Sequence, residues 1–402
     1  MPQNHISDNL ASYFNVFEES LSKPQFSHFQ SWNLGILHGK AQGSKISSQF
    51  SDKSETSVTR FLSQSSWDHH ELNRQRIVFA KNILQQKYQK YVPLIIDDTI
   101  FEKYGKKLPG IGWHWSHTDN AVVWGQSLVT SHMMAGDCDI PLFVDLYHKH
   151  SGQSKIDLAI GQIHQFRQLH LPDTTTGVVV TDTWYGCKDI INESLNNGFE
   201  LVTMLKSNRK VKVQGIDTWL SIRDISAKLE EHSLHHVTVD GVIYRFSQVT
   251  GTIHGIGGRT NKILLVQQYS DEKKSWSSFK YLLSTDTKMR AWTMIFLYRK
   301  RWKIETFYDF GKNQLKMADT RVLKELALLR FILLLFCSYT YLALRKFDSE
   351  YFENYEISYY QLQNQVIDKC QTQLIRWVYI QGQHGRPLTA ILSELRLVEI
   401  SA

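Results

Sequence analysis

Two short apolar runs that each end in aspartate constrain the fold of this chain more than any other feature. Residues 91–96 lead directly into Asp97 and Asp98, and residues 177–181 lead into Asp182. Runs this short and this rich in β-branched residues are typical of strands buried on both faces. Open α/β folds place their chemistry at the ends of such strands. The sequence therefore predicts an α/β protein with carboxylates gathered at one edge of its sheet.

The segment around these runs alternates between expected strands and helices. Three strands come first, and helices then alternate with strands up to about residue 208. The expected strands are residues 94–96, 121–129, 142–147, 178–181 and 200–205, and the expected helices are residues 156–169 and a segment after Gly186.

A third acidic residue, Glu305, lies in an expected helix with three other polar residues at helical spacing. Tyr298, Arg301, Glu305 and Lys312 follow one another at intervals of three, four and seven residues. At about 100° per residue, all four side chains share a face roughly 60° wide. This face offers a carboxylate beside two cations and a phenol, which suits a metal ion held against a phosphodiester. A solvated amphipathic face is the alternative interpretation.

The opposite face of the same helix is apolar and is expected to enter a core. Its residues are Ile304, Phe307 and Phe310.

The spacing Tyr-(2)-Arg-(3)-Glu-(6)-Lys resembles the signature of the cut-and-paste bacterial insertion-sequence transposases of family four. Trp302, directly after the arginine, also fits that family. The resemblance implies an RNase H-like fold with an Asp-Asp-Glu metal site made by Asp97, Asp182 and Glu305. It also implies two Mg²⁺ ions, for which Mn²⁺ can substitute.

By the same resemblance, the remaining signature residues hold the phosphates of a bound DNA end. They are Tyr298, Arg301, Lys312 and the adjacent Trp302.

Two aspartates compete for the role of first metal ligand. Asp97 directly continues the strand, and the order Asp97-Asp98-Thr99 fits the family pattern of an aspartate, a variable residue and a hydroxyl residue. We expect Asp97 to be the ligand, with Asp98 as a neighbouring or spare carboxylate.

Residues 1–88 are predicted to form a helical DNA-binding domain. After a polar interruption at residues 43–48, Ser54 is placed to cap a helix that buries Val58, Phe61 and Leu62. That helix exposes small hydroxyl residues and Arg60, an arrangement that resembles a helix-turn-helix. An ordinary helical bundle is the alternative, but the family commonly recognises its DNA ends with a domain in this position.

Residues 209–283 break the alternation and are predicted to form a β-rich insertion into a core made of residues 89–208 and 284–345. An Asp240-Gly241 turn between apolar runs predicts a hairpin. In the family, a tryptophan of such an insertion stabilises a flipped base, and Trp276 is the candidate here. His114 and His117 have a spacing that metal ligands use, but no further Cys or His completes a zinc site.

The last part of the chain returns to helix. Asp286 is placed to cap a single helix that runs to Lys312. Residues 331–344, bracketed by Arg330 and Arg345, form an apolar stretch that is too short to cross a bilayer and predicts a core helix. Residues 346–402 are expected to be a helical tail.

Composition agrees with a partner that is a polyanion. The 402 residues carry a net charge of +7 with a pI near 9.0. Four cysteines lack metal-ligand or disulfide spacing and predict free thiols in a reducing cytoplasm. The start of the chain has no signal-peptide pattern. We therefore expect a soluble bacterial protein associated with the nucleoid rather than with a membrane.

Taken together, these features predict a DNA transposase that cuts at the ends of an insertion sequence and joins them to target DNA. Its partners would be double-stranded DNA, as element ends and target, and a second copy of the chain when DNA is bound. Two alternatives remain. One is a nuclease of the same fold that never transfers strands, and the other is a decayed transposase that only occupies the ends.

Overall fold

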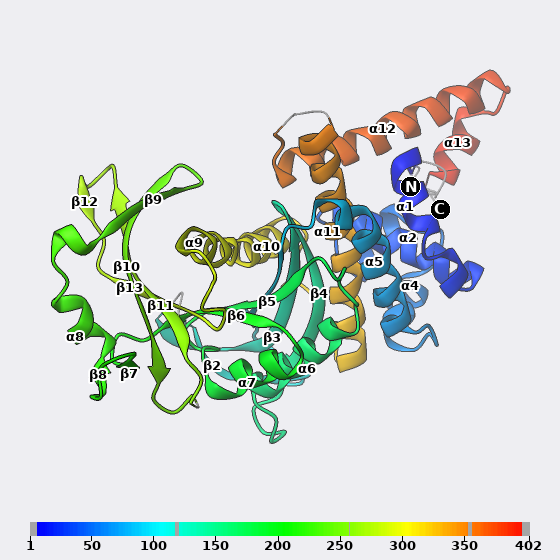
Figure 1. Cartoon of the computed structure of the whole chain (residues 1–402). Coiled ribbons are helices and arrows are strands. Elements are labelled where there is room, and N and C mark those ends of the chain that lie inside the picture. The colour runs from blue at the N-terminus through cyan, green and yellow to red at the C-terminus, as the bar shows by residue number, and fades with distance from the viewer. Residues whose placement is uncertain (1–5, 117–119, 257, 353–355, 396–402) are drawn as a thin grey trace.

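The computed structural model describes residues 6–116, 120–256, 258–352 and 356–395. A large sheet occupies the centre of the molecule (Figure 1). The β-rich segment extends from one side of this sheet, and the helices from both ends of the chain gather on the other side. The mixed α/β class predicted from the sequence is confirmed.

The centre of the sheet is β1 (Tyr91–Glu102), which has antiparallel β3 (Ala121–Ala135) on one side and parallel β5 (Thr176–Thr181) on the other. Parallel β6 (Glu200–Leu205) follows β5. The far edge of β3 pairs with β2 (Ile111–Ser116) along one half and with β4 (Cys138–Tyr147) along the other. All five expected strands are present, most of them longer than predicted, whereas β2 was not predicted.

The register of β1 and β5 brings the first two acidic residues together. Ile96 lies opposite Thr181 in this parallel pair, so Asp97 and Asp182 are the next residues on neighbouring strands. Such strands lie about 4.8 Å apart. The expectation that β1 ends at Asp97 is wrong, because β1 continues to Glu102 by pairing with β3, while β5 stops at Thr181.

The helix expected from Asp286 to Lys312 is two helices, α9 (Ala291–Lys300) and α10 (Trp302–Asn313). They meet at Arg301, whose N–H bonds to the carbonyl of Tyr298 and whose carbonyl accepts from the N–H of Ile304. Both bonds span three residues rather than four, which tightens the turn and ends α9. The apolar face was predicted correctly, because Ile304, Phe307 and Phe310 are buried.

Asp286 does not cap α9, contrary to the prediction. The residue before the helix is Arg290, and Asp286 lies four residues earlier in a turn. Its carboxylate accepts from the backbone N–H of Lys288 and from the hydroxyl of Tyr91, each at 2.8 Å. Asp286 therefore links this turn to the start of β1.

The β-rich segment continues the central sheet instead of forming a separate one. Its last strand, β13 (Lys280–Ser284), pairs antiparallel with β6 and then with β11 (Asn261–Ser270). The predicted hairpin is present as β9 (His235–Val239) and β10 (Val242–Ile253), with positive φ at Asp240 and Gly241 as the tight turn requires. The smaller elements of this segment are β7 (Lys210–Val213), β8 (Leu220–Ser221), α8 (Ile222–Ala227), η4 (Glu231–Ser233) and β12 (Ser275–Trp276).

Two helices that follow strands of the core also match the prediction closely. They are α6 (Lys155–Arg167) and α7 (Lys188–Asn196).

Helix α11 (Glu325–Phe352) joins both ends of the chain to the sheet. It packs against β4 and against α2, α4 and α5, so the amino-terminal helices share its core. The prediction that this helix is too short to cross a bilayer is wrong. By length and composition alone, a stretch of 25 of its residues is long and apolar enough to span one. The same stretch is 89% buried inside the protein, as in a core helix.

The remaining helices complete the two terminal regions. They are α1 (Asp8–Asn15), η2 (Glu18–Ser20), α2 (Lys23–Leu37), α3 (Gly43–Gln49), α4 (Glu55–Ser63), α5 (His69–Leu84), η3 (Gln85–Lys87), α12 (Tyr359–Gln383) and α13 (Leu388–Glu394).

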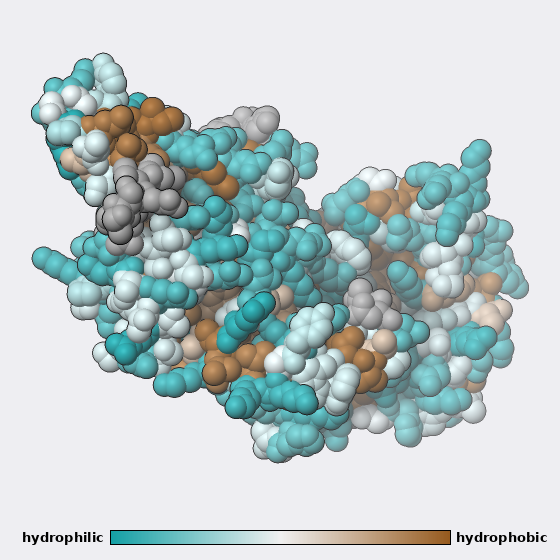
Figure 2. Space-filling model, turned by 180° about the vertical axis from the view of Figure 1, so that it is seen from behind, coloured by the Kyte–Doolittle hydropathy of each residue, from teal (hydrophilic) through white to brown (hydrophobic). Residues whose placement is uncertain are grey.

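The amino-terminal and carboxyl-terminal regions are built differently. In the amino-terminal region, Ser54 caps α4 as predicted by accepting from the N–H of Ser57, and the expected interruption at residues 43–48 is the helix α3. The carboxyl-terminal α12 projects from the body (Figure 1) and exposes Ile375 and Ile380. Seen from behind, most of the surface is hydrophilic, with an apolar cluster on this projecting arm (Figure 2).

Arg330 of α11 holds the end of α4 in place. Its guanidinium is 4% exposed and donates to the carbonyls of Leu62, Ser65 and Trp67, and it lies 4.5 Å from the centre of the Trp67 ring.

Arg330→Ala is expected to lower the free energy of unfolding by about 2–4 kcal/mol, because three carbonyls, two of them in buried hydrogen bonds, lose this donor. Arg74→Ala is the matched control, since Arg74 is exposed and pairs with Glu71 on the same helix, and it should cost less than about 0.5 kcal/mol. Urea unfolding of both variants measures the difference. Equal losses would show that the buried contacts contribute nothing specific.

Candidate active site

Asp97 and Asp182 are held by backbone donors at the end of the β1–β5 pair. One carboxylate oxygen of Asp97 accepts from the N–H of Asp98 at 2.9 Å. The carboxylate of Asp182 accepts from the N–H groups of Trp184 and Tyr185 at 2.9 and 3.1 Å, which closes the turn after β5. Both acids are therefore fixed in direction before any ligand arrives.

Arg301 connects Asp97 to Glu305. One guanidinium nitrogen lies 2.9 Å from Asp97 Oδ2, and the other lies 2.6 Å from Glu305 Oε1. The tight turn between α9 and α10 places Arg301 one helical turn before Glu305. The two carboxylates, which are 208 residues apart in the chain, therefore share one cation.

Asp97 and Arg301 shift each other's pKa values. Burial raises the pKa of Asp97 to about 7; the Arg301 guanidinium opposes this shift, and the carboxylates of Asp182 and Asp98 add to it. Burial also disfavours the charge of Arg301, but Asp97, Tyr298 and Glu305 outweigh it and raise the pKa of the guanidinium. The charge of Asp97 is therefore stabilised by the guanidinium of Arg301.

Asp98 lines the same cavity but has partners of its own. Its two oxygens accept from Lys155 at 2.5 Å and from the hydroxyl of Tyr185 at 3.1 Å. Successive residues of a strand point to opposite faces, so Asp97 faces α10 while Asp98 faces α6. This arrangement favours Asp97 over Asp98 as the acid that acts together with Asp182 and Glu305.

All residues of the predicted signature line one cavity with the acids. The cavity has a volume of about 1450 Å³ and reaches from the β1–β5 end to α10. Trp302 is 66% exposed at its rim, and the amino group of Lys312 lies 5.8 Å from the centre of the Phe101 ring. The members are Asp97, Asp98, Asp182, Tyr298, Arg301, Trp302, Glu305 and Lys312.

The other residues singled out from the sequence have different surroundings. Arg60 is exposed on α4 and does not line this cavity. Trp276 also lies outside it, packed under the guanidinium of Arg245 at 4.5 Å in the β-rich segment. His114 does line the cavity, where it is buried, whereas His117 falls outside the described residues.

The cavity also contains residues that the sequence did not point to. Lys155 begins α6, and nothing in its local sequence links it to Asp98, which is 57 residues earlier. Trp184 lies two residues after Asp182 and could have been noticed for that reason. Tyr308, three residues after Glu305, is buried and shares a 2.7 Å hydrogen bond with Thr130.

The donor chemistry of the cluster fits a divalent ion. Mg²⁺ and Mn²⁺ prefer carboxylate oxygens, and Asp97, Asp182 and Glu305 provide them in one cavity. Among the residues that the structure describes, no three Asp, Glu, His or Cys side chains come close enough together to hold a metal ion. The guanidinium of Arg301 lies between Asp97 and Glu305 and provides positive charge there.

Asp97→Asn is expected to stabilise the metal-free protein against unfolding at neutral and higher pH. The pKa of Asp97 rises from 3.8 to about 7 on folding, so the native carboxyl keeps a proton that the unfolded chain has lost. The stability of the wild type therefore falls as pH rises through this window, and asparagine does not titrate.

Urea unfolding in a chelator at about pH 5 and about pH 8 tests this expectation. The gain of Asp97→Asn over wild type should be larger at the higher pH, on the order of 1–3 kcal/mol. Asp173→Asn, at an exposed position, is the control and should show no such trend. A gain that is the same at both pH values would contradict a costly buried charge at Asp97.

Comparison with known families supports a nuclease. No curated protein matches the chain. Residues 45–218 match the family model of the DDE superfamily endonucleases, a span that includes Asp97 and Asp182 and ends before Glu305. The mixed α/β fold is compatible with such a nuclease, and endonuclease domains of this kind generally depend on divalent metals. Residues 45–218 are therefore similar to an endonuclease domain of the DDE superfamily, whose members act on DNA.

Proposed function

We propose that this protein is a DNA transposase that cuts the ends of an insertion sequence and transfers them to target DNA. The single observation that carries the proposal is that Asp97, Asp182 and Glu305 line one cavity. These three acids come from the β1–β5 strand pair and from a helix in which Glu305 lies 208 residues after Asp97 and 123 residues after Asp182. The spacing of Tyr298, Arg301, Glu305 and Lys312 supports the finer assignment to transposases of the family-four type.

The fold supports the same assignment. Strand order β4-β3-β1-β5-β6, with β5 and β6 parallel to β1 and β3 antiparallel to it, is the arrangement expected of an RNase H-like core. Strands β7 to β13 and α8 fall between the second and third acids, as an insertion into that core would.

The three acids would hold two Mg²⁺ ions. Ions bound there would supply the activation of an attacking oxygen and the neutralisation of charge on the scissile phosphate. The protein positions the acids beforehand, because backbone donors fix Asp97 and Asp182 and the α9–α10 turn fixes Glu305. These side chains are half-buried, and donors held in place in such a cavity interact with a phosphate more strongly than free groups in water do.

Arg301 and Lys312 would hold the phosphates of the bound strand. Both cations line the cavity, and in the absence of DNA the guanidinium of Arg301 pairs with Asp97 and Glu305. A phosphate in the cavity competes with these carboxylates for the guanidinium. DNA binding would thereby free Asp97 and Glu305 to hold metal.

Recognition of the DNA ends is assigned to the amino-terminal helices α3 and α4. The two helices pack closely, since a Cβ on Gly43 would lie 2.7 Å from the hydroxyl of Thr59, and α4 exposes Thr56, Thr59 and Arg60. Cutting and joining two ends requires both to be held together, so a dimer on DNA is part of the proposal. A soluble protein of the bacterial cytoplasm, acting at the nucleoid, is part of it as well.

A nuclease without strand transfer is the second candidate, because the match to endonucleases covers cleavage alone. The two functions differ in the fate of the 3′ hydroxyl, which a transposase joins to a second DNA molecule. A decayed end-binding protein is less consistent with the structure, since all three acids are present and line one cavity.

Glu305→Gln is expected to lower the rate of DNA cleavage by at least about 100-fold, because the amide keeps the shape of the side chain but cannot hold a divalent ion. Asp97→Asn and Asp182→Asn should behave alike, and combining them should add little, as expected of groups that act as a unit. The assay uses Mg²⁺ and a plasmid that carries the coding region with its flanking DNA.

Glu272→Gln, in the exposed turn after β11, is the matched control and should cut normally. Joined products that appear with the wild type and disappear with Glu305→Gln would support transposition. Cutting without any joining would favour the nuclease. Near-normal cleavage by Glu305→Gln would rule out the metal-binding role of this residue.

A further inference from the structure

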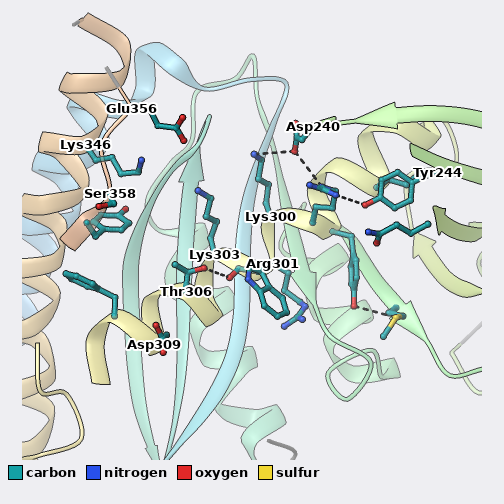
Figure 3. Close-up of a pocket in the computed structure, with 18 of the residues that line it drawn as sticks. Asp240, Tyr244, Lys300, Arg301, Lys303, Thr306, Asp309, Lys346, Glu356 and Ser358 are labelled. Carbon is teal, nitrogen blue, oxygen red and sulfur yellow. Dashed lines mark hydrogen bonds and ion pairs between the residues drawn. The ribbon is translucent and has the colours of Figure 1, made fainter. Parts of the chain in front are cut away.

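A second cavity lies on the other side of the α9–α10 segment, and no step of the proposed chemistry uses it. Its volume is about 1170 Å³. Three parts of the fold line it: the β-rich segment, α9 with α10, and the junction of α11 with α12 (Figure 3). We call it the second groove.

The second groove is positively charged. Its lining contains six lysine or arginine residues and three acidic residues. The cations are Lys280, Arg299, Lys300, Arg301, Lys303 and Lys346, and the acids are Asp240, Asp309 and Glu356.

Some of these cations serve the fold, and others face the groove. Arg299 and Lys300 lie 3.7 and 3.9 Å from Asp240 in the β9–β10 turn, and Lys300 also pairs with Asp137. The amino groups of Lys303 and Lys346 point into the groove in Figure 3, and that of Lys346 also donates to the carbonyl of Ile357 at 2.9 Å. Lys280 is exposed on the strand β13 that forms the opposite wall. Positive charge is thus available on both walls.

Aromatic rings line the same walls as these cations. Trp302 is 66% exposed and Tyr360 is 56% exposed, and both line the second groove. Tyr244, Tyr298 and Tyr359 add less exposed rings to the same walls. Cations that contact a phosphate backbone together with flat rings that stack on bases are typical of sites for single-stranded nucleic acid. Duplex DNA keeps its bases stacked inside and cannot use such rings.

The second groove is continuous with the cavity that holds the acids. Six residues line both, including Tyr298, Arg301 and Trp302. A DNA strand that leaves the acidic cavity over Trp302 therefore enters the second groove without crossing protein.

We propose that the second groove binds a single-stranded segment of DNA, continuous with the strand that lies at the three acids. This inference rests on the proposed function, because it takes DNA as the ligand of the acidic cavity. Lys280, Lys303 and Lys346 contact its phosphates, and Trp302 and Tyr360 stack on its unpaired bases. The ligand class is unpaired DNA, which forms where a duplex end is opened for cutting or joining.

Binding of a fluorescently labelled single strand of about ten nucleotides, a length in the range that one such groove accommodates, tests the proposal by fluorescence anisotropy. Tyr360→Ala and Lys280→Ala are the test variants, because both residues are exposed and neither touches the three acids. Tyr379→Ala, 64% exposed farther along α12, and Lys273→Ala, exposed beyond β11, are the matched controls.

Tyr360→Ala should weaken single-strand binding about tenfold, as expected for the loss of one stacked base. Lys280→Ala should weaken it less and reduce its dependence on salt. Binding of a blunt duplex of random sequence should stay unchanged, and so should the binding of both probes by the controls. Thermal melting checks that each variant is folded.

Unchanged single-strand binding by both folded test variants would overturn the proposal, and so would an equal loss for single strand and duplex. Anisotropy does not depend on cleavage. Normal cleavage by Glu305→Gln would therefore refute the proposed function while this measurement still decides whether the groove binds unpaired DNA.

Discussion

The parallel pairing of β1 with β5 determines where the acidic site forms. Ile96 lies opposite Thr181, so the next residue on each strand is an aspartate and the two side chains become neighbours. A shift of this register by one residue would turn one of the two acids to the opposite face of the sheet. β3 extends β1 beyond this point while β5 ends, and the cavity opens at the place where the two strands part. Helix α10 then completes the site by bringing Glu305 to the same side as Asp97.

Acidic side chains that lie close together need a nearby positive charge. In the DNA-free protein, the guanidinium of Arg301 supplies it to Asp97 and Glu305. The guanidinium contacts Asp97 and Glu305 and also belongs to the set of residues proposed to hold DNA phosphates. One side chain thus balances the charge of the site in the absence of DNA and would change partners when DNA and metal arrive. Because such couplings are reciprocal, DNA should tighten metal binding and metal should tighten DNA binding. Burial raises the pKa of Asp97, Arg301 opposes this shift, and the carboxylates of Asp182 and Asp98 add to it.

The sequence predicted the members of this site better than it predicted their connections. Regular offsets identified Tyr298, Arg301, Glu305 and Lys312, and apolar runs identified Asp97 and Asp182, because both signals are local. The break between α9 and α10 escaped prediction, since Arg301 keeps helical backbone angles and no glycine or proline marks the turn. Lys155 and β13 escaped it as well. Their partners, Asp98 and β6, lie more than 50 residues away in the sequence, and only the folded sheet brings them together.

The most direct test measures the affinity of the DNA-free protein for Mn²⁺ by electron paramagnetic resonance. It shows whether the guanidinium of Arg301 occupies the position that a divalent ion would take among the acids. Arg301→Ala leaves Asp97 and Glu305 without their shared cation, so it should bind Mn²⁺ more tightly than wild type, by about tenfold if the lost interaction amounts to about 1.4 kcal/mol. Adding Asp182→Asn to that variant should reverse the gain, which would locate the ion at the acids. Mn²⁺ affinity that is unchanged or lower in Arg301→Ala would contradict the account.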